Sequence, residues 1–252
     1  MTWRVRVLTA GAVLLTTFAQ ASEVTLEQKL QTFSVETGAT RVIYTPGSAG
    51  ATLTVINPQS YPMLVQSAVW QADKKTKAPF IVTPPLFRLD GHQQNRLKVV
   101  SIGDLGPTDQ ESLNWLCLTG IPPEPNAVWA QDGKVIKAAP AKQATLLTQL
   151  RVTSCLKLLV RPASLKGDPV DKAMSLTWHR SGTTLTVNNP TPFFMNLKSV
   201  RLGTTSISAP GYVPPKGHLG LKLPEHPAEG PVRWTLVTDY GGESREFSAA
   251  LQ

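Results

Sequence analysis

Most of the residue patterns that build enzyme active sites are absent from this sequence. It contains no G-x-S-x-G nucleophile elbow, no Gly-rich loop between a strand and a helix, and no pair of histidines at metal-ligand spacing. The four histidines are scattered, and the two cysteines do not form a CxxC motif. We therefore expect no catalytic residues, no metal and no cofactor, which leaves a binding function.

Helical periodicity and nucleic-acid-binding motifs are also lacking. The formal net charge is +8, but the lysines and arginines are spread along the chain and do not form one basic patch. Beyond the N-terminal segment, no apolar run is long enough to cross a bilayer comfortably. These absences argue against a helical protein, against nucleic acid as a partner and against insertion into a membrane.

Residues 1–21 have the three parts of a secretory signal peptide. Two arginines precede an apolar run at 7–18, and the segment ends in Ala-Gln-Ala. A single membrane anchor is the alternative, but the apolar run is short for that purpose. Cleavage after this segment would leave the chain in an oxidising compartment, where two cysteines usually form one disulfide, here Cys117–Cys155.

Prolines and glycines are plentiful and divide the remaining chain into short segments. Several of these segments alternate apolar and polar residues, as half-buried strands do. A long connection at 122–143 contains a possible small hairpin at 127–136. The pattern predicts an all-β protein of two sandwiches, with domains at 22–161 and 162–252. The candidate strands are 40–45, 51–58, 63–71, 80–85, 95–102, 112–121, 174–180, 183–190, 193–202, 218–223, 231–239 and 245–251.

One candidate strand is much longer than the others. The stretch TLLTQLRVTSCLKLLVRP, residues 145–162, is rich in Leu and Val and contains no glycine. From Leu146 to Val160 it would extend roughly 50 Å at about 3.3 Å per residue. Because strands are usually about five or six residues long, this strand is expected to do more than close a sheet.

Five fragments, in this order, strongly resemble the PapD-like periplasmic chaperones of the chaperone–usher pathway. They are TPPLFRLDGHQQNRLKVV (83–100), DQESLNWLCLTGIPP (109–123), CLKLLVRP (155–162), NNPTPFFMN (188–196) and TDYGG (238–242). The two cysteines and the long 122–143 connection resemble the subclass with a long loop before the seventh strand, which serves thin fimbriae and capsule-like polymers such as that of plague bacilli. The resemblance implies two immunoglobulin-like β-sandwich domains arranged as a boomerang.

The resemblance also implies a function. Such chaperones bind fimbrial or capsular pilin-type subunits in the periplasm by donor-strand complementation, aid their folding and prevent premature polymerisation. They then deliver the subunits to an outer-membrane usher. A secreted all-β pilus subunit or adhesin is the alternative, and it would show one sandwich with its own N-terminal donor segment.

The long strand supplies the expected donor face. Leu146, Thr148, Leu150 and Val152 have a period of two and therefore share one side of a strand. Thr148 is less apolar than a donor position prefers, and Leu147 would take part if a bulge shifted the register. Because this row is predicted to stay exposed until a subunit arrives, the free chaperone could cover it by self-association.

Seven residues match positions with known roles in the family. Arg41 and Lys157 match the cation pair that anchors the C-terminal carboxylate of a bound subunit. The family likewise implies that Cys117 and Cys155 lie on neighbouring strands, where their bridge would pin the donor strand beside this anchor. Glu111, Arg161 and Asp239 match a set of inter-domain salt bridges, which we interpret as structural.

Overall fold

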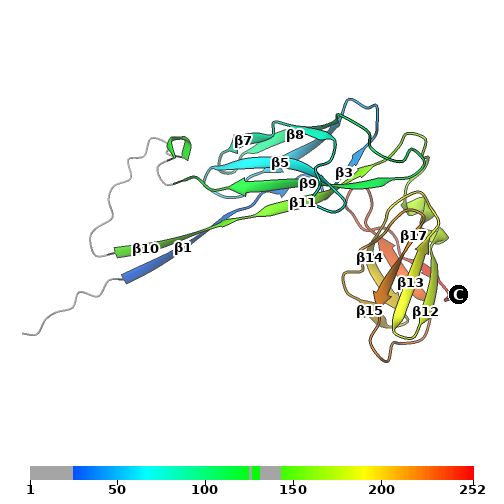
Figure 1. The fold of residues 1–252 in the computed structure, drawn as a ribbon. Helices are drawn as coiled ribbons and strands as arrows, with labels where there is room; N and C mark the ends of the chain where they lie inside the picture. Colours follow the sequence, from blue (N-terminus) through cyan, green and yellow to red (C-terminus); the bar gives the residue numbers. More distant parts are fainter. Residues whose placement is uncertain (1–24, 125–126, 131–142) are drawn as a thin grey trace, which may run out of the picture.

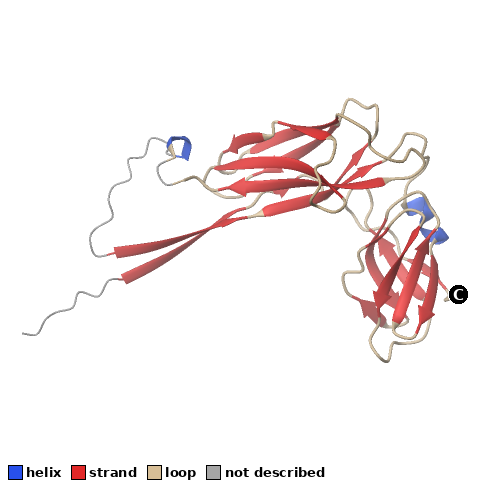
Figure 2. Cartoon of the chain, viewed as in Figure 1, coloured by secondary structure: helices blue, strands red, loops and turns tan. Residues whose placement is uncertain are grey.

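The computed structural model describes residues 25–124, 127–130 and 143–252. They form two β-sandwiches set at an angle to each other, with a long two-stranded ribbon projecting from the first (Figure 1). Figure 2 shows that strands dominate both domains, and the described helices are two short 3-10 segments, Val128–Ala130 and Val170–Ser175. Among the described residues, no helix is long and apolar enough to cross a membrane.

The N-terminal sandwich packs a five-stranded sheet against a four-stranded one. The alternating burial of its strands brings one face of each sheet into a common core, as in β5, where every second residue from Met63 to Val69 is buried. The five-stranded sheet has the order β3 (Arg41–Tyr44), β11 (Thr153–Val160), β9 (Ser112–Ile121), β5 (Met63–Gln71), β7 (Leu86–Leu89). The other has the order β2 (Glu36–Thr37), β4 (Ala51–Ile56), β8 (Gln94–Ser101), β6 (Phe80–Thr83).

The C-terminal sandwich has its own core, around the fully buried Trp178 and Trp234, whose ring centroids lie 5.2 Å apart. Its smaller sheet has the order β12 (Thr177–Ser181), β13 (Thr184–Asn189), β17 (Gly217–Lys222). The other has the order β15 (Thr205–Ile207), β14 (Met195–Leu202), β18 (Val232–Leu236), β19 (Phe247–Ala249), and β16 (Tyr212–Val213) also pairs with β14. The two separate cores confirm two immunoglobulin-like sandwiches.

The projecting ribbon consists of β1 (Thr25–Phe33) and β10 (Gln143–Arg151), which pair in parallel over their full length. Among the described residues, neither strand has a second neighbour in a sheet, so each has one open edge (Figure 1). A two-stranded ribbon is marginal by itself in water. The described structure therefore exposes backbone and side chains that most proteins cover.

The base of the ribbon is fixed where β1 crosses β9. Gly120 leaves room for this crossing, because a Cβ there would lie 2.2 Å from the carbonyl oxygen of Phe33. The Phe33 ring packs 5.1 Å from that of Tyr61, whose hydroxyl accepts from the Thr32 N–H and donates to the Thr32 carbonyl. The ribbon is thus clamped to the first domain at one end only.

Most of the predicted strands are present, and the differences are informative. β5 and β9 match their predicted bounds, whereas β1 was not predicted at all. Met174 and Ser175 belong to a 3-10 helix and not to the predicted strand at 174–180. In the predicted hairpin at 127–136, Val128–Ala130 form a 3-10 helix, and the Asp-Gly turn lies outside the described residues, as does the signal peptide.

Candidate binding surface

Along the segment formed by β10 and β11, every second side chain points to the same side, but that side is buried in β11 and exposed in β10. Leu156 and Leu158 of β11 point into the core of the first sandwich and are buried. Leu146 and Leu150 of β10 have the same parity but are 51% and 46% exposed, because the ribbon has no sheet packed against it. The apolar side that forms a core in β11 therefore continues into solvent along β10.

Strand β1 places one leucine, Leu30, on the same side of the ribbon as Leu146 and Leu150. In the parallel register, Leu30 lies beside Thr148 and is 65% exposed. Gln28 lies beside Leu146, and Thr32 beside Leu150. Each of these three pairs across the ribbon, which we call rows, therefore has one leucine and one polar residue. The leucine is on β10 in the first and third rows and on β1 in the second. Leu30 supplies the apolar group that Thr148 lacks.

The predicted donor face is not uniform along its length. Val152 lies between the two strands and is only partly exposed. Its N–H donates to the Phe33 carbonyl, and its carbonyl accepts from the Gly120 N–H. The long strand is thus interrupted at this one residue. Leu147, the alternative position, has the opposite parity and is 49% exposed. The donor row of Leu146, Thr148, Leu150 and Val152 therefore stays a prediction.

Arg41 and Lys157 are direct neighbours across strands β3 and β11. Both side chains reach towards the second domain. Lys157 donates to Oδ1 of Asn196 and has its Nζ 4.2 Å from the centroid of the Tyr212 ring. One guanidinium nitrogen of Arg41 lies 3.4 Å from the Val237 carbonyl oxygen. The cation pair therefore lies in the cleft between the domains.

The charged forms of Arg41 and Lys157 are disfavoured in the free protein, because the pKa of each is lowered. Burial lowers the pKa of Arg41, although Asp239 and Glu111 partly offset this effect. The pKa of Lys157 falls to about 8, chiefly through burial and then through repulsion from Arg41 and Lys74. The Nε atom of Arg41 is buried without a hydrogen-bond partner. An anion placed here would relieve the repulsion and could accept a hydrogen bond from Nε of Arg41.

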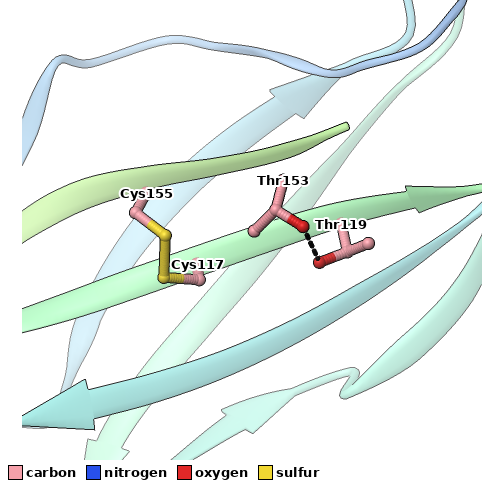
Figure 3. The surroundings of a disulfide bond; sticks show 4 residues. All are labelled: Cys117, Thr119, Thr153 and Cys155. Atoms are coloured by element: carbon pink, nitrogen blue, oxygen red, sulfur yellow. Dashed lines mark hydrogen bonds between the residues drawn. A yellow bond between two sulfur atoms is a disulfide. The ribbon is translucent and has the colours of Figure 1, made fainter. Parts of the chain in front are cut away.

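The predicted disulfide is present and joins the central strands of the five-stranded sheet (Figure 3). Cys117 on β9 and Cys155 on β11 are directly opposite each other. Two residues further along, the hydroxyls of Thr119 and Thr153 lie 2.9 Å apart. The bridge therefore holds β11 against β9 between the cation pair and the base of the ribbon.

Arg161 joins two acidic residues across the domain boundary. Its Nε donates to Oε1 of Glu111 at 2.6 Å, and its two terminal nitrogens donate to both oxygens of Asp239 at 2.6 and 2.9 Å. The second oxygen of Glu111 accepts the N–H of Phe194 in the C-terminal domain. The Glu111 side chain is fully buried, so burial raises its pKa despite the nearby guanidinium. Removing one member of such a buried set costs about 3–5 kcal/mol.

An apolar cluster reinforces the same boundary. Leu113 and Leu159 of the first domain pack against Phe194 of the second, and all three are buried. Ile43, Trp115 and Tyr212 surround them. Apolar packing and a hydrogen-bonded ion network therefore hold the cleft together, which fixes the distance between Arg41, Lys157 and the C-terminal domain.

Comparison with known proteins identifies the two sandwiches. Residues 34–166 match the pili and flagellar-assembly chaperone family, PapD N-terminal domain, and residues 171–248 match the pili assembly chaperone PapD, C-terminal domain. The chain is 42% identical to chaperone protein AggD of Escherichia coli over 98% of both chains. It is 40% identical to chaperone protein caf1M of Yersinia pestis, over 86% of this chain and 85% of that one.

Solved structures agree with the sequence matches. The match to the E. coli chaperone DraB covers 90% of this chain and 100% of the DraB chain, at 46% identity and a TM-score of 0.77. The Salmonella enterica SafB chaperone, solved in complex with the SafA pilin, covers 89% at 45% identity and a TM-score of 0.78. The chain belongs to the PapD-like family of pilus-assembly chaperones, which favours that expectation over a pilus subunit or an adhesin.

Proposed function

We propose that this chaperone captures an incomplete pilin-type subunit by lending it the exposed side of the β1–β10 ribbon. The observation that carries the proposal is the continuity between the core-facing side of β11 and the open side of β10. A subunit that lacks its last strand exposes a groove of apolar side chains and unpaired backbone groups. The ribbon offers both complements at once, apolar side chains and free strand edges.

The leucines of the ribbon determine how far the contact extends. Leu146, Leu30 and Leu150 occupy three successive rows on one side, so a groove would meet an apolar group at each row. Burying one exposed leucine contributes about 1.5–3 kcal/mol in transfer free energy. Thr148 on β10 and Val152, which follows the end of β10, complete the predicted donor positions. Backbone pairing along an open edge would add hydrogen bonds that do not depend on the subunit sequence.

Arg41 and Lys157 would bind the C-terminal carboxylate of the subunit. Their adjacent positions support this role, as does the fact that Glu111 and Asp239, the acids that act on Arg41 among the described residues, are already bound by Arg161. A guanidinium and an ammonium can each donate to a carboxylate, and such charge-assisted bonds are the stronger kind. Glu111, Arg161 and Asp239 would act structurally, by keeping the cleft at the angle that holds the cation pair beside the second domain.

The remaining parts of the expected function follow from this role. Residues 1–21 would direct the chain to the periplasm and be removed, leaving domains at 22–161 and 162–252. Delivery to an outer-membrane usher would release the ribbon for another cycle. The role requires no catalysis, because binding alone hides the aggregation-prone groove. A free chaperone could hide its own leucines by self-association.

A capture experiment tests the proposal. The chaperone is co-expressed with the pilin-type subunit encoded beside its gene and purified through a tag on the chaperone. Leu150→Asp should abolish the one-to-one complex, since a carboxylate in an apolar groove is costly. Gln149→Asp, on the opposite side of the same strand, is the matched control and should retain it.

The anchor is tested separately in the same assay. Arg41→Ala or Lys157→Ala should prevent capture while leaving a folded chaperone, because losing one partner of a buried charged contact costs roughly 2–5 kcal/mol. Capture by either of these variants at the wild-type level would exclude the anchor. Capture by Leu150→Asp at the wild-type level would exclude the ribbon.

A further inference from the structure

Four residues form a row across the outer side of the five-stranded sheet, beginning at the proposed anchor. Arg41 on β3 is paired with Lys157 on β11, Lys157 with Trp115 on β9, and Trp115 with Trp70 on β5. Directly opposed residues in a sheet share one side, with Cβ atoms about 4.5–5.5 Å apart. The two cations are therefore followed on the same side of the sheet by two half-buried tryptophans, Trp115 and Trp70, which form an aromatic floor.

Lys74 covers this aromatic floor. Its Nζ lies 3.9 Å from the centroid of the Trp115 ring, a cation–π contact. The turn that carries Lys74 is braced, because Asp73 accepts hydrogen bonds from Lys75 N–H, Thr76 N–H and the Thr76 hydroxyl. Within the part of the chain that the structure describes, no carboxylate forms a salt bridge with Lys74.

The row and its lysine have a surplus of positive charge. Lys74 is close enough to Lys157 to help lower the pKa of that ammonium, and Arg41 acts in the same direction. The two acids nearest to Arg41, Glu111 and Asp239, are already bound by Arg161. One carboxylate between Arg41 and Lys157 would therefore still leave Lys74 without an anionic partner.

We propose that Lys74 and Trp115 form a specificity subsite beside the carboxylate anchor, which selects subunits with an acidic side chain at their C-terminal end. The proposal rests on the proposed function, since it assumes that the chain end of a subunit binds between Arg41 and Lys157. The terminal carboxylate would take the anchor, and the second carboxylate would pair with Lys74. The aliphatic part of the acidic residue would lie on the Trp115 ring, beside the ammonium.

The experiment uses synthetic octapeptides that end in Gly-Glu, Gly-Gln or Gly-Leu and are otherwise identical, each with a free C-terminus. Titration into the full-length chaperone is followed by nitrogen–proton NMR, with the indole N–H of Trp115 as the local reporter. The Glu peptide should bind roughly two- to fivefold more tightly than the Leu peptide, the range expected for one exposed ion pair. That preference should shrink at high salt, where exposed charges are screened.

Variants assign the preference to Lys74. Lys74→Gln should remove the difference between the Glu and Leu peptides, and Lys74→Arg should keep it. Lys75→Gln is the matched control, because it makes the same charge change one residue away in the same turn, and it should retain the preference. A preference that survives in Lys74→Gln, or disappears equally in Lys75→Gln, overturns the proposal.

Peptides with an amidated C-terminus separate this proposal from the anchor itself. If amidation has no effect on affinity, the anchor at Arg41 and Lys157 is wrong. If amidation abolishes binding but the Glu, Gln and Leu peptides bind equally, the anchor stands and the subsite is wrong. If the Glu peptide does not bind at millimolar concentration, the proposed subsite is also wrong.

Discussion

Strands β10 and β11 are almost one strand, yet they have opposite environments. Both consist mainly of Leu, Val and Thr, and only Val152 separates them. β11 lies between β3 and β9 with its leucines buried. In the described part of the chain, β10 pairs only with β1 and exposes Leu146 and Leu150. The same local pattern therefore provides stability in one half and an open surface in the other.

The difference shows that composition does not decide whether a strand is a core element or a docking element. That decision depends on what lies on each side of the strand. An exposed apolar edge is normally a hazard that proteins suppress with charge, proline or a covering element. Retention of such an edge here, on a ribbon clamped only at its base, is consistent with a surface that another chain covers.

The largest expected effect concerns the disulfide, which braces β11 and is remote from β10. Replacing both Cys117 and Cys155 with Ala should lower the free energy of unfolding of the N-terminal domain by about 4 kcal/mol, because the bridge closes a loop with a sequence separation of 38. Scanning calorimetry should show an earlier first transition and an unchanged transition for the C-terminal domain. An unchanged N-terminal transition would contradict the bracing role.

A second effect compares one leucine from each half of the segment. Leu158→Ala should lower the free energy of unfolding by about 2–5 kcal/mol, because Leu158 is fully buried. Leu150→Ala should change it by about 0.5 kcal/mol or less, since this residue is on the surface. Urea unfolding of the two variants gives both values. Equal losses would mean that the β10 side chains belong to the core of the free protein.

The third effect is the pH dependence of subunit affinity, which depends on Lys157 on the side of β11 that faces the cleft. Because the pKa of Lys157 is lowered to about 8, its protonated fraction falls about tenfold between pH 7 and pH 9. Subunit affinity should fall by a similar factor, since the carboxylate needs the ammonium. The stability of the free chaperone should shift the other way, rising from pH 8 towards the unfolded-state pKa of 10.5, as deprotonation removes the cost of burying the charge.

Lys157→Arg is the control for this pH profile, because a guanidinium stays charged throughout the range. Affinities of the wild type and of the variant are measured by titration calorimetry at pH 7, 8 and 9. A flat profile for the wild type would show that Lys157 does not bind the carboxylate.

The smallest effect concerns the two strands of the ribbon. Leu30→Thr should weaken capture several-fold, because it leaves the row of Thr148 without a leucine to bury in the groove. Adding Thr148→Leu to that variant should restore capture, since the leucine returns to the same row on the other strand. Competitive binding to the subunit gives the ratio. No rescue by Thr148→Leu would indicate that the strands act independently.

The sequence by itself determined much of the local structure. Alternating apolar and polar residues predicted most strands, and the length and composition of residues 145–162 singled out the segment that leaves the domain. The spacing of Leu146 and Leu150 placed both on one side, and the structure has the two side chains exposed. These properties follow from the period of two in a strand, which can be read one residue at a time.

Tertiary structure decided which strands meet. β1, with its polar sequence TLEQKLQTF, carries a weak strand signal, and nothing local could place Leu30 beside Thr148. The row from Arg41 to Trp70 draws on four different strands, and Lys74 reaches it because its turn follows β5, which pairs with β9. Such contacts depend on strand order and register, which are chosen by the burial of the whole core and not by any single segment.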